Sequence, residues 1–444
     1  MSLTRSLTRL IRSKPMNDAD LRAAALFVLD TLACAVAGRD APPARMLATV
    51  APLAQGDVAR RAFLIGGLAH ILEMDDLHRD SVTHPGSVVI PAAWAVAEQR
   101  VDGGHRFLAA VLAGYEACCR VGMAVGKAHY RVWHNTSTCG PFGSAMAVST
   151  LLDLGEDQTV WALGNAGTQS SGLWEFLATG AMSKHLHTAR GAESGVLAAL
   201  LAKEGFTGPE RILEGEKGFF AGFCPDPRPE AVLENPGLPW ELTRTSIKPW
   251  PCCRHTHPAI DAAFELRAAL KGAAIAKVEV GAYRAAIDVC DRPEPQDPYS
   301  AKFSLQHTVT VALADGRVDQ ASFDSAARQR LENARKRVSV AVSPKVDAAY
   351  PQAWGVELSV ESADGRKFTA SRRDAKGDPE NALSEAELIT KARTMLLESG
   401  LPAGRTEALI ESILALAADR PVRGLGLSSY LDASETKSRR IGKV

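Results

Sequence analysis

73-EMDDLHRDSVTHPGSVVIP-91 is a charged stretch flanked by two apolar runs. Its acids and histidines are Glu73, Asp75, Asp76, His78, Asp80 and His84. The run 64-LIGGLAHIL-72 precedes it and another begins at Gly86 or Ser87, and both have helical spacing of apolar residues. Charged loops on rigid scaffolds are where catalytic groups concentrate, whereas the alternative is a solvated acidic connection. We expect two helices that present a charged loop.

The rest of the first half also has helical periodicity. Asp18 is a good N-cap for a helix that ends at Gly38, and Ala and Gly at successive turns favour close helix packing. The connection at 174–183 is expected to be irregular. The expected helices cover residues 18–38, 42–52, 59–72, 87–99, 104–126 and 156–171.

The pattern changes after the proline-containing stretch 234-ENPGLPWELTRT-245. Alternating residues predict strands at 277–283 and 337–343 and a hairpin over 354–373, whereas 301–313 is ambiguous and favours a helix. Ser384 and Glu387 form a capping box for the next helix, and a last helix over 405–418 is expected to return to the first domain. The predicted fold is mainly α: a large all-helical domain over 1–243 joined by 403–444, and a smaller α+β domain over 244–402.

Composition narrows the classes of partner. The 444 residues favour two domains, and 51 basic residues balance 51 acidic ones, which argues against nucleic acid or a membrane surface as a partner. The eight cysteines include no CxxC pair, the N-terminus lacks an apolar signal core, and no apolar run approaches the length that spans a bilayer. We expect a cytoplasmic protein whose partners are small molecules or another copy of itself.

Cationic side chains gather at three helix starts. His134 precedes a Gly-rich helix whose free N–H groups would suit an anion. In 183-SKHLHTAR-190, Lys184 is expected in a loop, with His187 and Arg190 on one face of the following helix. In 248-KPWPCCRHTH-257 the prolines keep the chain extended until a helix begins near His257. For each histidine alone, a satisfied structural role has about the same weight as catalysis.

Several common catalytic sites have no support in the sequence. HExxH, GxSxG, the dinucleotide-binding glycine pattern and the P-loop are all absent. Two HxH pairs, at 185–187 and 255–257, make a zinc or iron site conceivable, but the spacing matches no zinc signature. What remains is a group of histidines and lysines with acids, which suits a polycarboxylate: cations neutralise its charges, and a base removes a proton next to a carboxylate.

Five segments in order resemble the MmgE/PrpD family: 69-AHILEMDD-76, 83-THPGSVVIPAA-93, 134-HNTSTCGPFGSA-145, 183-SKHLH-187 and 248-KPWPCCRHTHPAIDA-262. The resemblance implies a helical domain with a smaller α+β domain, a homodimer, and catalysis without a metal or organic cofactor. It also implies a lyase or isomerase that acts on a small di- or tricarboxylate. The expected reaction is most like that of 2-methylcitrate dehydratase, with epimerisation of iminodisuccinate or decarboxylation of cis-aconitate as alternatives.

The resemblance also assigns residues. The expected catalytic groups are Glu73, His84, His134 and Lys184, and the expected substrate-binding groups are Lys248, Arg254, His257 and His187. Glu73 stands where the decarboxylase branch has Asp, and Cys253 replaces a histidine of that branch. These departures favour the dehydratase and epimerase relatives. They also motivate an alternative of another class, a protein that binds a carboxylate without catalysis.

Overall fold

The computed structural model describes residues 1–50, 57–237, 239–422 and 427–431, and the chain divides into two compact units. The helical unit comprises Met1–Ile71, Asp75–Thr245 and Ser384–Val444. The mixed unit comprises Leu72–Met74 and Ser246–Leu383. The chain therefore leaves the helical unit for three residues inside the charged stretch and again after Thr245.

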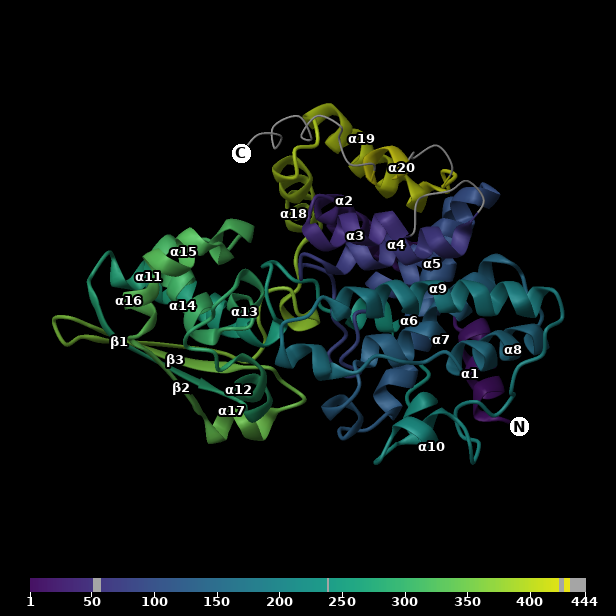
Figure 1. Cartoon of the computed structure of the whole chain (residues 1–444), viewed down its shortest axis with the longest axis horizontal. Helices are drawn as coiled ribbons and strands as arrows, with labels where there is room; N and C mark the ends of the chain where they lie inside the picture. Colours follow the sequence, from purple (N-terminus) through teal and green to yellow (C-terminus); the bar gives the residue numbers. More distant parts are fainter. Residues whose placement is uncertain (51–56, 238, 423–426, 432–444) are drawn as a thin grey trace. The chain divides into compact units, whose positions relative to one another are not determined.

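The helical unit is built on long helices that pack directly on one another (Figure 1). In chain order its helices are α1 Leu3–Ser13, α2 Asp18–Gly38, α3 Pro42–Val50, α4 Val58–His70, α5 Gly86–Arg100, α6 Gly104–Ala124, α7 Asn135–Leu151, α8 Glu156–Gly167, α9 Ser183–Lys203, α10 Phe219–Phe223, α18 Glu385–Glu398, α19 Ala403–Leu414 and α20 Leu427–Leu431. Short 3-10 turns connect several of them, including Trp174–Ala178 in the segment expected to be irregular. The predicted helices of the first half are confirmed, with ends shifted by a few residues. Residues 51 and 52 of the third lie outside the described part.

Small residues bring three of these helices close together. A Cβ on Gly143 of α7 would lie 2.7 Å from the Cβ of Cys118 on α6, and one on Gly195 of α9 would lie 2.3 Å from the Cβ of Ser144. Larger side chains at these two positions would force the helices apart. The close approach lets α6, α7 and α9 carry chemistry-bearing side chains into one buried region.

The mixed unit contains a four-stranded sheet of order β2-β1-β3-β4. Its strands are β1 Ile275–Ala282, β2 Val338–Val342, β3 Val356–Ser362 and β4 Lys367–Arg372. Its helices are α11 His257–Leu270, α12 Arg284–Cys290, α13 Pro298–Ala301, α14 Leu305–Asp315, α15 Ser325–Arg330, α16 Glu332–Arg335 and α17 Pro344–Ala349. The predicted strands, and the helix favoured for the ambiguous segment, are confirmed.

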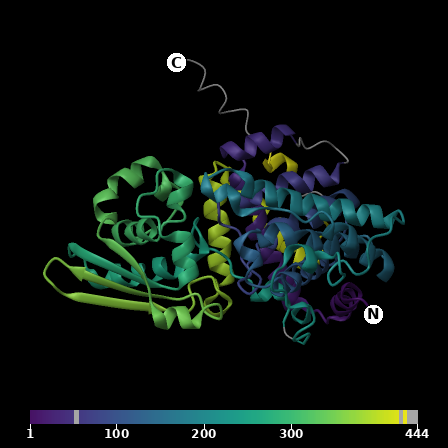
Figure 2. The same cartoon turned by 60° about the horizontal axis from the view of Figure 1, so that its bottom comes forward.

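Strand β1 is the centre of this sheet. It pairs parallel with β2, where Val278 lies opposite Val338, and antiparallel with β3, where Val280 lies opposite Leu358. The buried valines and leucine of β1 and β3 share one face and alternate with more exposed residues on the other, and α11 and α14 pack along one side of the strands (Figures 1 and 2). The alternation read from the sequence is therefore the burial pattern of a sheet covered by helices.

The expected division at residue 403 differs from the structure, because the chain rejoins the helical unit at Ser384. Helix α18 packs against α2, and Lys391 of α18 forms a buried ion pair with Asp30 of α2 at 2.5 Å. A second correction concerns Lys184, which lies in the first turn of α9 and not in a preceding loop.

Two helices are long and apolar enough to cross a membrane by length and composition alone, α2 and α6. This corrects the expectation that no run approaches that length. The most apolar windows of the two helices are 78% and 89% buried inside the protein, respectively. Their apolar character is therefore accounted for by packing in the helical unit.

The Asp30–Lys391 pair provides a test of how α18 is held. Replacement of Lys391 by Met should lower the free energy of unfolding by about 3–5 kcal/mol, because the Asp30 carboxylate stays buried without its cation. Urea unfolding followed by circular dichroism measures the change. The control is Lys345→Met, which breaks an exposed pair with Glu357 and should cost at most about 1 kcal/mol. Equal losses in the two variants would contradict the role given to the buried pair.

Candidate functional site

The charged stretch leaves α4 at His70 and enters α5 at Gly86. The Asp76 carboxylate accepts hydrogen bonds from the Tyr115 hydroxyl at 2.7 Å and from the Gly86 N–H at 3.1 Å. A Cβ at Gly86 would lie 2.7 Å from that hydroxyl and 2.8 Å from the carboxylate, so only glycine fits. Burial, and then the nearby charge of Asp75, raise the pKa of Asp76 well above its usual value. Asp76 thus fixes the loop to the start of α5 and to α6.

A small hairpin inside the loop sets the position of His84. His78 and Thr83 pair as an antiparallel bridge, and the Ser81 hydroxyl lies 2.8 Å from the His78 Nδ1 and 2.6 Å from the Thr83 hydroxyl. The His78 Nε2 lies 3.0 Å from a carboxylate oxygen of Glu241, which is also buried. These bonds satisfy the buried polar groups of the hairpin and leave His84 at its exit.

Two histidines share one carboxylate. The Oδ2 of Asp75 lies 2.6 Å from the Nδ1 of His70 and 3.4 Å from the Nδ1 of His84. His84 Nδ1 also donates to the carbonyl oxygen of Asp76 at 2.6 Å. The two imidazole rings lie 4.6 Å apart between centroids. This arrangement orients both rings, and a buried carboxylate beside them balances a positive imidazolium.

His134 and His187 lie on the other side of this group. Their Nδ1 atoms are 3.2 Å apart, and the His134 ring lies 6.1 Å from His70 and 6.2 Å from His84. Burial, then the charge of Lys184, hold the pKa of His134 well below its usual value. Burial is also the main cause that lowers the pKa of His187 to about 4. Both imidazoles are therefore neutral near pH 7 and able to accept a proton.

The three histidines nearest one another could also hold a divalent metal. One ring nitrogen of each of His70, His84 and His134 lies within 4.8 Å of the others, and a carboxylate behind a histidine is common around zinc. The cation of Lys184, which lowers the pKa of His134, would repel such an ion. The donor set fits a metal, whereas the surrounding charge does not favour one.

Aromatic side chains that the sequence did not single out close one side of this group. The Trp174 ring lies 4.7 Å from that of His134, and the Phe176 ring lies 5.5 Å from that of His187. The His134 N–H donates to the Gly172 carbonyl at 2.9 Å, which holds the segment in place. No local pattern indicated Trp174 or Phe176. His70, in contrast, lies within 69-AHILEMDD-76, a segment already singled out for its resemblance.

Four of the predicted site residues belong to the mixed unit. Glu73 and Lys248 are both buried and form an ion pair at 3.3 Å, and Lys248 also donates to the Glu73 carbonyl at 3.2 Å. Glu73 has a φ of 58°, a left-handed conformation that is uncommon for a residue with a side chain. Such a conformation persists only where the surroundings impose it, and it is frequent at functional sites.

Arg254 and His257 have other partners. Arg254 Nη2 lies 2.5 Å from an oxygen of the buried Asp378, and His257 Nε2 lies 3.3 Å from the carbonyl oxygen of Cys252. The charge of Arg254 is thus already balanced by a protein carboxylate. A substrate-binding role for these two residues stays a prediction.

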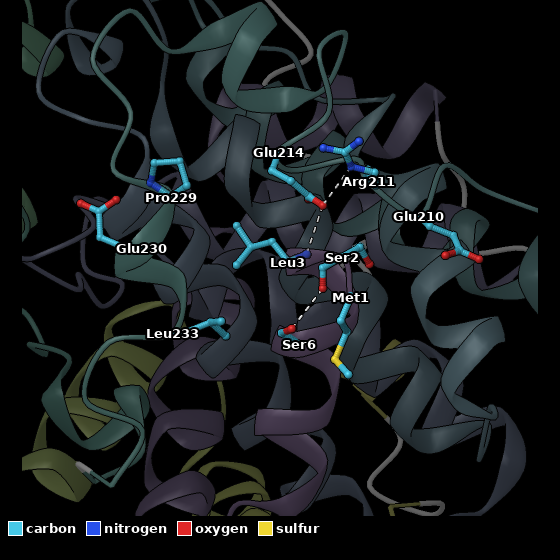
Figure 3. A pocket seen from close by; sticks show the side chains of 10 residues that line it. All are labelled: Met1, Ser2, Leu3, Ser6, Glu210, Arg211, Glu214, Pro229, Glu230 and Leu233. Carbon is cyan, nitrogen blue, oxygen red and sulfur yellow. Dashed lines mark hydrogen bonds and ion pairs between the residues drawn. The ribbon is translucent and has the colours of Figure 1, made fainter.

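A surface pocket of about 750 Å³ lies elsewhere in the helical unit, at the start of α1 (Figure 3). Three of its lining residues are acidic, Glu210, Glu214 and Glu230, and Arg211 is its basic one. The Leu3 N–H donates to Glu214 at 3.1 Å across it (Figure 3). Its lining includes none of the predicted site residues, and its acidic character disfavours an anionic ligand.

The eight cysteines are all buried. Burial raises the pKa of Cys252 to about 12, so this thiol is not a nucleophile near pH 7. Burial is likewise the main cause that raises the pKa of Cys290 well above its usual value, and its thiol is in contact with that of Cys253. The cysteines accordingly behave as small packed side chains.

Comparison with known proteins places the chain among relatives. Family models described as the MmgE/PrpD N-terminal domain and the MmgE/PrpD C-terminal domain match residues 6–232 and 250–416. The cis-aconitate decarboxylase-like protein oryM of Aspergillus oryzae is 34% identical over 223 residues, and the match covers 46% of each chain, so it spans about half of that relative. Cis-aconitate decarboxylase of Aspergillus terreus is 26% identical over 73% of this chain and 71% of its own. The human cis-aconitate decarboxylase is 28% identical over 75% of this chain and 71% of its own.

The two family models together cover most of the chain, and they agree with a helical part followed by a part that contains a small sheet. Four of the five segments that carried the resemblance lie inside the matched residues, and the fifth, 248–262, lies inside them from residue 250 onward. The chain belongs to the MmgE/PrpD family and is an enzyme of its lyase or isomerase type.

Proposed function

We propose that this protein is a cofactor-independent lyase that removes a proton next to a carboxylate of a small di- or tricarboxylate. The observation that carries the proposal is the buried group of His84, His134, His187 and Lys184 in the helical unit. A di- or tricarboxylate substrate needs a cation and a base, and this group offers a buried lysine beside neutral imidazoles. The lysine neutralises a carboxylate, and an imidazole accepts the proton.

The division of roles follows from the surroundings of each group. His134 and His187 are neutral near pH 7, so they suit proton acceptance or hydrogen bonding to the substrate. His84 lies beside the Asp75 carboxylate, which would stabilise it once it has accepted a proton. Neutralisation of the substrate carboxylate by Lys184 would lower the barrier to forming a carbanion at the adjacent carbon.

For Glu73 and Lys248, which belong to the mixed unit, the predicted roles are kept as proposals. Glu73 would balance the charge of Lys248, with which it is paired, and Lys248 would bind a substrate carboxylate. Arg254 and His257 are kept as further proposed binding groups. Arg254 would have to exchange its present partner Asp378 for the substrate, which makes it the weakest of these assignments.

Two reactions are the leading candidates. The relatives named above are cis-aconitate decarboxylases or decarboxylase-like, which favours cis-aconitate as a substrate. Glu73 and Cys253 depart from the residues of the decarboxylase branch, which favours dehydration of 2-methylcitrate. Epimerisation of iminodisuccinate uses the same proton abstraction and is retained as a third.

A substrate panel tests the proposal directly. Metal-free enzyme, prepared with a chelator, is mixed in D₂O with cis-aconitate, 2-methylcitrate, citrate or iminodisuccinate and followed by NMR. We expect product, or deuterium uptake next to a carboxylate, with at least one compound, because the groups above need no metal. Thermal stabilisation by these compounds without turnover or exchange would favour the non-catalytic carboxylate-binding alternative. Activity that appears only after zinc or iron is restored would contradict cofactor independence.

Replacement of Lys184 by Met tests its two roles. Loss of a charged contact to the substrate should raise KM about tenfold or more, which corresponds to roughly 1.5 kcal/mol. Loss of the lysine charge should also raise the pKa of His134, so the acidic limb of kcat/KM should move to higher pH. Arg190→Met is the matched control, because Arg190 lies on the same helix but is exposed and paired with Glu193. A pH profile and KM equal to those of the control would exclude Lys184 from the site.

We also propose that the protein is a cytoplasmic homodimer. Two apolar side chains near the histidine group are about half exposed, Leu173 and Leu186, which favours a covered surface. Light scattering should give a mass of twice 47.3 kDa. Leu186→Arg should shift the protein toward the monomer, whereas Leu397→Arg, at an equally exposed leucine of α18, should not. A monomeric wild-type protein at micromolar concentration would contradict the proposal.

A further inference from the structure

We propose that His70 is a further catalytic residue and that Asp75 is the positioning residue for both His70 and His84. The proposal rests on the proposed function, and it adds the second proton-transferring group that a lyase or epimerase needs. His70 was not among the residues assigned by resemblance. It is the last residue of α4, whereas the assigned acid and histidine of this region follow it at Glu73 and His84.

The contacts with Asp75 and Asp76 indicate the tautomer of each ring. His70 presents Nδ1 to the Asp75 Oδ2 at 2.6 Å. His84 presents Nδ1 to the same oxygen at 3.4 Å and to the Asp76 carbonyl oxygen at 2.6 Å. A carbonyl oxygen and an ionised carboxylate only accept hydrogen bonds, so each Nδ1 carries the proton. The Nε2 of each ring is therefore the basic nitrogen.

The rings converge on one place. One ring nitrogen of His70 lies within 4.8 Å of one from His84 and one from His134. The His70 ring also lies 6.3 Å from that of His185. Helices α4, α5, α7 and α9, which carry or flank these residues, pack against one another in the helical unit. A substrate carbon next to a carboxylate, if it lay beside His84, would therefore also be within reach of His70.

Two imidazoles on one carboxylate can provide an acid and a base together. In dehydration, one imidazole takes the proton from carbon while an imidazolium gives a proton to the departing hydroxyl, and water leaves. One carboxylate balances one imidazolium, so Asp75 suits a pair in which one ring is charged and the other neutral.

A purely structural reading of His70 makes a different prediction. A histidine in the last turn of a helix interacts favourably with the helix dipole, and a buried bond to Asp75 adds stability. On that reading, loss of His70 would lower stability and leave the turnover of folded enzyme unchanged. The two readings are therefore separated by kcat, measured on protein that is shown to be folded.

The experiment compares His70→Gln, Asp75→Asn and His129→Gln in the full-length protein. His129 is the matched control, a buried histidine bonded to the Phe223 carbonyl and the Thr138 hydroxyl. We expect kcat to fall about 10²-fold or more in the first two variants, with KM changed less than about threefold, and to stay within about threefold in the control. Asp75→Glu should recover part of the activity lost in Asp75→Asn. In ¹⁵N-histidine spectra, Asp75→Asn should change the tautomer signals of His70, whereas His84 should keep its tautomer, because its Nδ1 also donates to the Asp76 carbonyl oxygen.

Each outcome decides the assignment. Wild-type turnover with full activity of His70→Gln overturns it and leaves the proposed function intact. Should the wild type turn over none of the compounds, the proposed function fails. The binding of tricarballylate then tests whether His70 contacts a carboxylate ligand. A dissociation constant at least fivefold weaker in His70→Gln than in His129→Gln then supports contact between His70 and the ligand. Equal affinity, or no binding to the wild type, overturns it.

Discussion

The buried carboxylates of Asp75 and Asp76 are the constraint on which the site depends. A charged loop enclosed by helices is stable only if its polar groups find partners, and these two residues anchor the two ends of its network. Asp76 fixes the loop to Gly86 at the start of α5 and to Tyr115 of α6. Asp75, next to it in the chain, faces the histidines instead. Two adjacent residues thus have different tasks: Asp76 anchors the loop to the helices, and Asp75 contacts the histidines.

The scaffold and the electrostatics support each other. Glycines on α7 and α9 allow the close packing that buries His134, His187 and Lys184. Burial removes water from these side chains, and together with the lysine charge it keeps both imidazoles neutral near pH 7. In the mixed unit, the left-handed conformation of Glu73 and its pair with Lys248 show a comparable local constraint.

Membership of the MmgE/PrpD family and the side chains point to the same kind of chemistry. The relatives are named for decarboxylation of cis-aconitate, in which a C–C bond breaks, carbon dioxide leaves and a proton is added to carbon. The histidine group of this chain places neutral imidazoles beside a lysine, which suits proton transfer next to a carboxylate. The departures at Glu73 and Cys253 concern the mixed unit, whereas the histidine group lies in the helical unit. The proton transfer proposed for His84, His134 and His70 is thus compatible with more than one substrate of this class.

The sequence by itself determined the fold class, because the period of apolar residues distinguishes the long helices of the first half from the strands of the second. It also indicated His84, His134, Lys184 and His187, since each lies next to a helix start with a distinctive composition. Only the tertiary structure decided that α18 belongs with the helical unit, through its contact with Asp30, and that Lys184 is helical. It alone revealed that Asp75 holds His70 and His84 together and that Trp174 covers His134. Periodicity depends on neighbours a few residues apart, whereas a shared carboxylate or a ring contact depends on distances between segments that the sequence does not encode locally.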